Sequence, residues 1–549
     1  MEKHSCKNCS SSFEITKDDV EFYDKLAIPS PTFCPDCRLQ RLLSWRNENT
    51  YYSRTCNKCE CKVISVHSPD QPYPIYCNKC WWSDDLYAID YGRDFDFDRP
   101  FFDQFIELQK DVPQIAMMND NGVASENCEY CQDFAFGKNC YLVTGSWKIR
   151  DSFYSNNTNH VQDVVDCSSV NLESELVYES VHSQKLYNCS FMNVSTNCTD
   201  CHFGYDLKGC KDCFGCIGLR QKQYFIFNEA HTEEEYREKM SKIDLGSYEG
   251  LEKVKKDFAD FILNFPRKHI NQINCENCIG DNLYNCKNTV GFDCFHAEGC
   301  KYFYKGDHPQ FCYDIYQSGN PQWCCESITP DDSFMTAYSL WCWKDKHVFY
   351  SDNCHSSEHL FGCIGLRRQK HCILNKKYSE EEYEDLKARI IEHMKKTGEW
   401  GQFFPVEKSP FGYNETVAQD YFPLTKEQAV EKGYKWKDID PKNYQESTYK
   451  IPDGIHDAPD SIVDEVLACS DCKKNYKIIR GELAFYRKMD LPIPEKCPDC
   501  RRLDRMKLQT PKKLWKRTCH KCGIEIQTAF APDRPENVYC EQCYLKEVA

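Results

Sequence analysis

Eight Cys-x-x-Cys pairs, four at each end of the chain, constrain the fold more than any other feature of the sequence. Each cysteine of the first four pairs recurs at the other end after a shift of 463 residues. Neighbouring residues keep the same shift, so that the segment CPDCR at 34–38 recurs at 497–501. The two ends of the chain are therefore one module written twice.

The spacing of these pairs is typical of metal sites. Two thiolates separated by two residues can bind one metal ion, and two such pairs complete a closed tetrahedral zinc site. The first site of each module has 24 residues between its pairs and the second has 17. The longer site, whose second pair contains a proline at a helix start, predicts a treble-clef-like arrangement. The shorter one suits a zinc ribbon with both pairs on hairpins.

We therefore predict four structural zinc sites. Cys61 is matched by Ile524 in the second copy, so we expect that it is not a ligand. The predicted ligands are Cys6, Cys9, Cys34, Cys37, Cys56, Cys59, Cys77, Cys80, Cys469, Cys472, Cys497, Cys500, Cys519, Cys522, Cys540 and Cys543.

The segments CPDCR, RTCHKCG and APDRPENVYCEQCY resemble the zinc-ribbon and zinc-binding modules of proteins from small-genome, uncultivated bacteria. The segment GEWGQFFPVEKSPFGYNETVAQDYFPLTKEQAVEKGYKW resembles the same full-length proteins, so the resemblance covers nearly the whole chain. It implies zinc binding at the sixteen cysteines. It carries no established activity.

The middle of the chain is also duplicated, with a shift of 147 residues. FGCIGLR stands at 214–220 and again at 361–367, and Cys128 and Cys131 recur as Cys275 and Cys278. Thr232 and Ser379 each precede a glutamate by three residues, which is a helix capping box. The middle is therefore predicted to be a repeated unit of strands that ends in a helix.

Short Cys, Tyr, Phe and Val runs between Asn, Asp, Gly and Ser indicate strands and corners in this middle region. Cys167, Cys189 and Cys210 lie 22 and 21 residues apart, a plausible coil length for a β-solenoid. We predict two short parallel β-solenoid halves, with an irregular antiparallel β-domain as the alternative. The fold class is thus multi-domain and mainly β, with small α content and a duplicated module at either end.

The predicted organisation has six parts. Residues 246–265 are expected to form an amphipathic helix that covers the solenoid. The parts are a double-zinc module (1–82), an aromatic and acidic linker with a helix (83–126), a first β-repeat half with helices (127–273), a second half with a helix (274–399), an aromatic, proline-marked belt (400–464) and a second double-zinc module (465–549).

The predicted zinc sites use 16 of the 39 cysteines and leave 23. Cys210 is matched by Ser357 and Cys213 by Leu360 in the second half, and a metal ligand cannot be replaced in this way. We expect most of these cysteines to pack as small apolar residues. The candidates for further metal are the pairs kept in both halves, Cys128, Cys131, Cys275 and Cys278.

The net charge of −16 is unevenly distributed. Residues 83–464 carry −23, residues 1–82 carry +1 and residues 465–549 carry +6. An acidic body repels phosphate backbones, so a nucleic-acid surface is expected only at the ends. The chain shows no run of 18 apolar residues and no apolar segment at its start, which favours the cytoplasm, where thiols stay reduced.

One basic stretch in the second module, residues 500–519, has chemistry suited to RNA or DNA. It holds eight basic side chains, one acid and a tryptophan, and such rings and guanidinium planes stack on unpaired bases. A solvated helix and linker is the alternative interpretation. The candidate contacts are Arg501, Arg502, Arg505, Lys507, Lys512, Lys513, Trp515, Lys516 and Arg517.

The sequence contains no phosphate-binding loop motif, no nucleophile motif of serine hydrolases and no zinc-binding motif of metalloproteases. A closed four-thiolate site leaves no coordination position for a reacting water. The leading hypothesis is a non-enzymatic cytoplasmic scaffold or adaptor whose second module contacts nucleic acid. A protein-binding or self-assembling structural protein is the alternative, and an enzyme with its site in the cysteine-rich middle is the second alternative.

Overall fold

The chain forms two compact units, each of which joins one end of the chain to one half of the middle. The computed structural model describes residues 2–298, 301–304, 312–313, 315, 319, 325–326, 328, 331–438, 445, 447 and 449–548. Unit 1 comprises Met1–Met117 and Gln272–Asp438, and unit 2 comprises Met118–Asn271 and Ile439–Ala549. The first cysteine module therefore shares a unit with the second repeat, and the second module with the first repeat.

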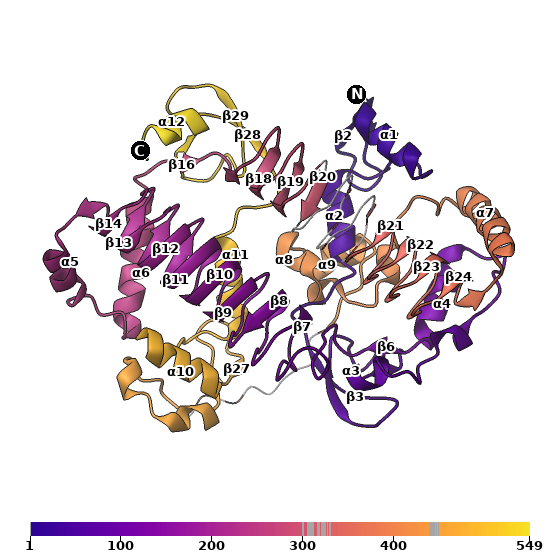
Figure 1. Cartoon of the computed structure of the whole chain (residues 1–549), viewed down its shortest axis with the longest axis horizontal. Helices are drawn as coiled ribbons and strands as arrows, with labels where there is room; N and C mark the ends of the chain where they lie inside the picture. The colour runs from indigo at the N-terminus through magenta and orange to yellow at the C-terminus, as the bar shows by residue number, and fades with distance from the viewer. Residues whose placement is uncertain are drawn as a thin grey trace. The chain divides into compact units, whose positions relative to one another are not determined.

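The body of unit 2 is a parallel β-solenoid, which Figure 1 shows as a ladder of short strands. Its strands pair in chain order, and partners in neighbouring coils are 12 residues apart, as for Gln132 and Thr144, or 13 around a bulge in β10. The strands are β7 (Gln132–Ala135), β8 (Thr144–Arg150), β9 (Asn159–Val165), β10 (Ser168–Tyr178), β11 (Val181–Asn193), β12 (Thr196–Tyr205), β13 (Lys211–Ile217), β14 (Gln223–Ile226) and the antiparallel β15 (Glu229–Ala230).

Each coil is built from three-residue steps. Asn139 (φ +53°) precedes the buried Cys140, and Leu142 (φ +51°) precedes the buried Val143, a pattern that continues along the solenoid. A left-handed residue turns the chain at every corner, and Asn and Asp tolerate that conformation well. Four such steps complete a 12-residue coil. The expected coil length of 21 to 22 residues is wrong, because the interval from Cys189 to Cys210 is seven of these steps.

The inward side chains stack from coil to coil as the core of unit 2. Val177, Cys189, Cys201 and Cys213 form one such column, and all are 0% exposed. The Cys189 thiol donates to the carbonyl of Tyr187 at 3.3 Å, within its own coil, and alternatively to one in the next coil. Cysteine alternates with larger apolar side chains such as Leu186 and Met192 in this core, and acts here as a small buried residue with a weak donor.

Unit 1 contains the second parallel solenoid, which confirms the predicted β-solenoid body in both halves. Coils step by 11 residues between Ile279 and Val290 and by 12 between Phe334 and Lys346. Its strands are β17 (Gln272–Ile273), β18 (Ile279–Tyr284), β19 (Val290–Phe295), β20 (Lys301–Tyr304), β21 (Phe334–Ala337), β22 (Lys346–Phe349), β23 (Glu358–Phe361), β24 (Lys370–Ile373) and the antiparallel β25 (Lys376–Lys377).

Each solenoid half ends in a hairpin and a capped helix, as the capping boxes predicted. Thr232 caps α5 (Glu233–Met240) and Ser379 caps α7 (Glu380–Thr397). The next helix of unit 2, α6 (Tyr248–Ile262), packs Leu251 and Phe258 against Phe203, which confirms its predicted role as a cover. Among the helices that the structure describes, none is long and apolar enough to cross a membrane.

The cysteine modules repeat one local design. In every site the first pair lies on a turn between two short antiparallel strands and the second pair at the start of a helix. The elements of the first module are β1 (Glu2–Ser5), β2 (Ser12–Ile15), α1 (Lys17–Lys25), α2 (Pro35–Leu43), β3 (Tyr52–Thr55), β4 (Lys62–Ser65), β5 (Ile75–Tyr76) and α3 (Asn78–Trp81). Those of the second are β26 (Leu467–Ala468), β27 (Asn475–Tyr476), α10 (Arg480–Met489), α11 (Pro498–Lys507), β28 (Trp515–Thr518), β29 (Glu525–Thr528), β30 (Val538–Tyr539) and α12 (Glu541–Leu545).

The shorter sites therefore differ from the two-hairpin ribbon expected for them. Cys77 is the N-cap of α3 and Cys540 the N-cap of α12, so a helix replaces the second hairpin. Backbone N–H groups at a helix start favour a negatively charged thiolate, which explains the placement. The remaining elements of unit 1 are η1 (Ala88–Tyr91), α4 (Phe101–Asp111), β6 (Gln114–Ile115), η2 (Val406–Lys408), η3 (Tyr413–Glu415), α8 (Val417–Tyr421) and α9 (Lys426–Glu431), and those of unit 2 are β16 (Arg267–Lys268), η4 (Ile455–Asp457) and η5 (Asp460–Asp464).

Candidate metal centres

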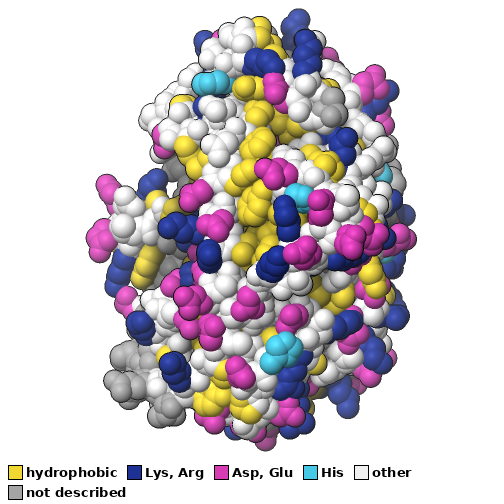
Figure 2. Space-filling view, turned by 90° about the vertical axis from the view of Figure 1, so that its left-hand side faces the viewer, with side chains coloured by type: hydrophobic (Ala, Val, Ile, Leu, Met, Phe, Trp, Pro, Cys, Tyr) yellow, Lys and Arg dark blue, Asp and Glu magenta, His cyan; other side chains and the backbone are white. Residues whose placement is uncertain are grey.

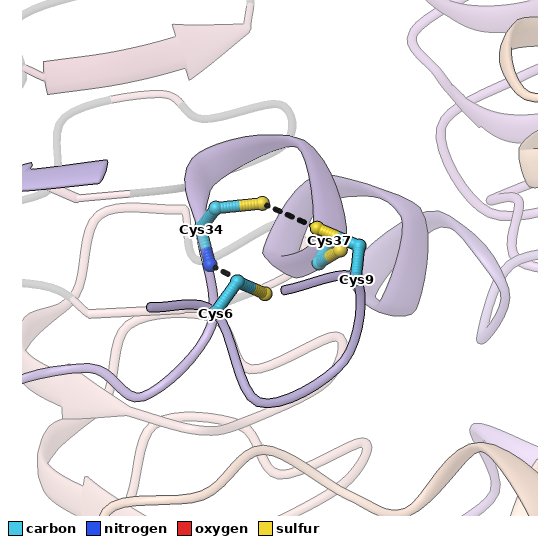
Figure 3. A group of neighbouring side chains, drawn as sticks. All are labelled: Cys6, Cys9, Cys34 and Cys37. Atoms are coloured by element: carbon cyan, nitrogen blue, oxygen red, sulfur yellow. Dashed lines mark hydrogen bonds between the residues drawn. The ribbon is translucent and has the colours of Figure 1, made fainter. Parts of the chain in front are cut away.

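Four groups of four cysteines bring their sulfur atoms together in the described part of the chain. Within each group all four sulfurs lie within 4.8 Å of one another. Figure 3 shows the first group, in which the side chains of Cys6 and Cys9, on the turn after β1, point toward those of Cys34 and Cys37 at the start of α2. Each module thus has two four-cysteine clusters, three of them with the predicted members and one with a single different cysteine.

The distances between sulfurs fit a tetrahedral metal. A Zn–S bond of about 2.3 Å places sulfurs about 3.8 Å apart in a regular tetrahedron. The Sγ atoms of Cys9 and Cys34 are 3.6 Å apart, and those of Cys522 and Cys540 are 3.8 Å apart. A donor set of four thiols favours zinc among the divalent ions common in proteins. The residues therefore fit a closed, structural metal site.

Backbone donors prepare one thiol of each cluster for ionisation. The N–H of Cys34 donates to Cys6 Sγ at 3.2 Å, and the N–H of Cys540 donates to Cys519 Sγ at 3.2 Å. Burial alone would raise the pKa of Cys519. The backbone N–H groups of Cys540, Cys522 and Lys521 outweigh this effect and lower the pKa to about 6. Hydrogen bonds from Ser11 lower the pKa of Cys9 to about 6 as well.

The second cluster of the first module contains a fifth thiol. The sulfurs that lie within 4.8 Å of one another are those of Cys56, Cys59, Cys61 and Cys77, so Cys61 takes the place that the spacing assigned to Cys80. Against the expectation that Cys61 is not a ligand, its sulfur belongs to the group that could hold the metal ion. Cys80 remains close, because its thiol interacts with those of Cys56, Cys59 and Cys77. Cys61 follows the turn of the first pair, and its Sγ lies 3.3 Å from that of Cys59.

The extra metal candidates of the middle lie inside or at the end of a solenoid. Cys128 and Cys131 are fully buried in the core of unit 2, and Cys275 and Cys278 are half-buried in unit 1. None of them belongs to one of the four metal-compatible groups found in the described chain. The thiols of Cys128, Cys275 and Cys278 instead donate to backbone carbonyls, as Cys275 does to the carbonyl of Ile273 at 3.3 Å.

Helix α11 of the second module is joined to the solenoid of unit 2 by buried charges. Arg501 and Arg505 both contact the carboxylate of Asp166, at 3.1 and 2.7 Å, and all three side chains are at most 3% exposed. Arg501 also lies 3.3 Å from Glu482, which accepts a hydrogen bond from Tyr154 of the solenoid. These two arginines of the basic stretch therefore hold the module in place and are not at the surface.

The first module is joined to the solenoid of unit 1 at matching positions. Arg38, the counterpart of Arg501, lies 3.8 Å from Glu326, and Arg41 lies 2.6 Å from the same carboxylate. Asp19, the counterpart of Glu482, contacts Lys301 and accepts a hydrogen bond from Tyr313. The sequence showed the repeated arginine of CPDCR but gave no sign of its partner in the middle.

The remaining basic side chains of residues 500–519 are more accessible. Lys507, Lys513 and Lys516 are exposed, and Lys513 Nζ lies 5.9 Å from the centre of the half-buried Trp515 ring. Lys507 pairs with Asp504. Arg502 and Lys512 are half-buried, and Arg517 donates to the backbone carbonyl of Ala531 at 3.2 Å.

The repeated segment FGCIGLR is where the last helix of each module, α3 or α12, meets a solenoid. Both of its glycines have positive φ, such as Gly218 at +71° and Gly365 at +69°, as the corners require. A Cβ on Gly218 would lie 2.9 Å from Val548, just beyond α12. The final arginine reaches the module: Arg367 donates to the backbone carbonyls of Trp81 and Ser83. Each copy of FGCIGLR is therefore a solenoid corner against which a cysteine module packs.

No protein-family model and no curated protein matches the chain. One solved structure, described as a "putative acetyltransferase from Desulfovibrio desulfuricans G20", aligns with 8% sequence identity over 43% of this chain. The alignment spans 64% of that structure, less than two thirds of its length, with a TM-score of 0.09. A similarity this weak says nothing about the fold or the function of this chain.

Proposed function

We propose that the chain is a non-enzymatic scaffold of a reducing compartment such as the cytoplasm, in which four zinc ions fix two cysteine modules onto two β-solenoids. One observation carries this proposal. In both units the helix that follows a cysteine cluster contributes buried arginines to carboxylates of the solenoid, Arg505 to Asp166 and Arg41 to Glu326. A metal ion bound at the start of each helix would keep its arginines next to the carboxylates of the solenoid.

Closed four-thiolate sites favour a structural role. All four positions of a tetrahedral ion are taken by protein sulfur, so no position is left for a substrate or a reacting water. Solenoids present long, regular surfaces to partners, and each coil is stable only against its neighbours. Modules clamped along such a body would hold partners at fixed separations.

The experiment that tests this proposal combines metal content with hydrogen exchange. The full chain, purified under reducing conditions, is expected to hold four zinc ions, each with sulfur neighbours at about 2.3 Å by X-ray absorption. Chelation should remove protection at α2, α3, α11 and α12 while solenoid strands such as β11 and β12 stay protected. Fewer ions, or a chelated chain that keeps these helices protected, would contradict the proposal that zinc fixes the modules onto the solenoids.

Nucleic-acid contact by the second module is a second candidate function. The observation in its favour is the exposed group of Lys513 and Lys516 around the half-buried Trp515. The face of the molecule drawn in Figure 2 shows basic and acidic side chains interspersed, so it offers no surface of one sign. Contact would therefore be local and strongly dependent on salt.

A binding measurement with single-stranded RNA and DNA separates this candidate from a purely protein-binding scaffold. Replacing Lys512, Lys513 and Lys516 by glutamate is expected to abolish binding and its dependence on salt. The matched control replaces the exposed Lys473, Lys474 and Lys477 of the same module by glutamate, which makes the same charge change elsewhere. Equal loss in both variants, or no binding by the native chain, would favour protein partners.

A further inference from the structure

Unit 1 contains a cavity of about 320 Å³ beside the second copy of FGCIGLR. One wall is the segment after α3, which includes Trp82 and Tyr87, and the other is formed by two successive solenoid corners, which include His355, Arg367 and Arg368. This volume lies at the lower end of the range for small-molecule sites. Both walls belong to unit 1.

Arg367 brings to this cavity a positive charge that forms no ion pair within the described chain. Its guanidinium lies 4.2 Å from the Trp81 ring and 4.9 Å from the Trp82 ring. Two of its N–H groups bond to backbone carbonyls, and no carboxylate of the described chain forms an ion pair with it. Burial lowers the pKa of Arg367 to about 10, so it stays charged at neutral pH. The exposed Asp84 offsets part of this charge, and Arg368 on the rim adds a second positive charge.

His355 adds two polar atoms that lack partners. The residue is 7% exposed, and its ring lies 5.2 Å from that of Trp82 and 4.8 Å from that of Trp343. Neither ring nitrogen has a hydrogen-bond partner in the described chain. Burial lowers the pKa of His355 to about 3, so the neutral ring has one N–H donor and one acceptor, both unmet. Such groups are costly unless something binds them.

Unit 2 has a cavity at the matching position, but there a carboxylate neutralises the arginine. Arg220, the counterpart of Arg367, lies 2.6 Å from Asp206, and that carboxylate also accepts a hydrogen bond from Tyr544 of α12. The cavity there has a volume of about 170 Å³. At the position matching Asp206, unit 1 has Asn353. The repeat thus provides an internal comparison in which one arginine has its anion and the other has none.

We propose that the cavity of unit 1 binds a small organic anion that carries a planar ring. The phosphate or carboxylate group of this ligand lies next to Arg367 and Arg368 and supplies the negative charge that Asp206 supplies to Arg220 in unit 2. The ring packs against Trp82, and a polar atom of the ligand bonds to His355. This site is separate from the four cysteine clusters, and it would add ligand binding to the proposed scaffold function.

Calorimetric titration of the zinc-loaded full chain tests the proposal with four probes. Phenyl phosphate and benzoate supply a ring with each kind of anion and so distinguish the two sources of charge. Inorganic phosphate and phenol each lack one half of the ligand. At least one ringed anion is expected to bind at least about tenfold more tightly than both partial probes. Absence of binding by both ringed anions up to about 10 mM would overturn the proposal.

Three variants locate the site. Arg368→Gln and His355→Phe are each expected to weaken the preferred probe about tenfold, because the first removes a positive charge and the second removes a hydrogen-bonding group. His355→Phe should also raise the melting temperature of the ligand-free chain, since it removes two unmet polar atoms and keeps the ring packing. The matched control Arg220→Gln, in the other unit, should leave binding unchanged. Native affinity in the first two variants, or an equal loss in the control, would overturn the assignment.

Discussion

Arg505 and Asp166 form a fully buried ion pair, with 2.7 Å between Nη1 and Oδ1, although 339 residues separate them in the chain. Asp166 has a φ of +52° and stands at the solenoid corner before the inward Cys167. The corner thus points its carboxylate outward, into the cysteine module. A charge removed from water must be paired, so this contact fixes where α11 lies on the solenoid.

The first prediction concerns this pair. Asp166→Ala leaves the buried guanidinium of Arg505 without a carboxylate and that of Arg501 with Glu482 alone, and breaking a buried pair in this way costs about 3–5 kcal/mol. The loss should appear in the free energy of local opening of α11, measured by native-state hydrogen exchange. The control is Lys488→Met, which removes the exposed pair of Lys488 with Asp163 and should cost less than about 1 kcal/mol. Equal effects of the two variants would contradict a buried clamp.

The second prediction concerns the five thiols around the second cluster of the first module. Cys61→Ser and Cys80→Ser each leave four thiols that can surround a metal, so both variants should keep four zinc ions per chain. The double variant should lose one ion, measured by elemental analysis.

The second module provides the control for this redundancy, because Ile524 stands where the first has Cys61. Cys543→Ser, at the position that matches Cys80, should therefore lose one ion by itself. Loss of an ion in Cys61→Ser alone would show that Cys61 is an obligatory ligand. Loss in Cys80→Ser alone would restore the assignment made from spacing.

The third prediction concerns the buried thiols of the solenoid. Cys128→Ala together with Cys131→Ala should leave the zinc content unchanged, because neither residue belongs to a four-sulfur group. The variant should be destabilised only modestly, since each change removes one sulfur atom from the core. The comparison variant Cys6→Ser should lose one zinc ion. A parallel loss of metal in the double variant would show that the core thiols bind metal.

The sequence predicted the metal clusters well because their signal is local. Two thiols three positions apart come close together on a tight turn. The spacing alone therefore identifies pairs such as Cys6 and Cys9 as ligands of one metal ion. Cys61 lies outside that rule, because its proximity to Cys59 depends on how one hairpin folds. The docking partners were not predictable at all. Nothing near Asp166 in the sequence indicates that an arginine 339 residues away will reach it.

The solenoid was predicted as a class but not in its period. Templates for strands and helices use periods of 2 and 3.6, and the period here is three. The signal is nevertheless present: in RDSFYSNNTNHVQDVVDCS, at 150–168, a small or β-branched residue stands at every third position and is buried. Asn, Asp or another residue with positive φ precedes it, as Asp151 precedes Ser152.

The last prediction uses a carboxyl group inside the solenoid of unit 1. Asp345 takes an inward position between Ser333 and Ser357, and it accepts the N–H of Ser357 at 2.7 Å. Burial raises the pKa of Asp345 to about 8, above its usual value of 3.8. Between these two pH values the folded chain keeps a proton that the unfolded chain has released. Stability therefore falls as pH rises from about 4 to 8, by up to about 1.4 kcal/mol per pH unit.

Asp345→Asn should remove this dependence, because the amide keeps the shape of the protonated acid and does not ionise. Hydrogen exchange of β22 and β23 in the zinc-loaded chain, measured from pH 5 to 8 and corrected for intrinsic exchange, is expected to show weakening protection in the native chain and a smaller change in the variant. Asp163→Asn, on the outer face of the other solenoid, serves as the control and should follow the native profile. If the native chain and Asp345→Asn respond equally to pH, the carboxyl group is already ionised in the core.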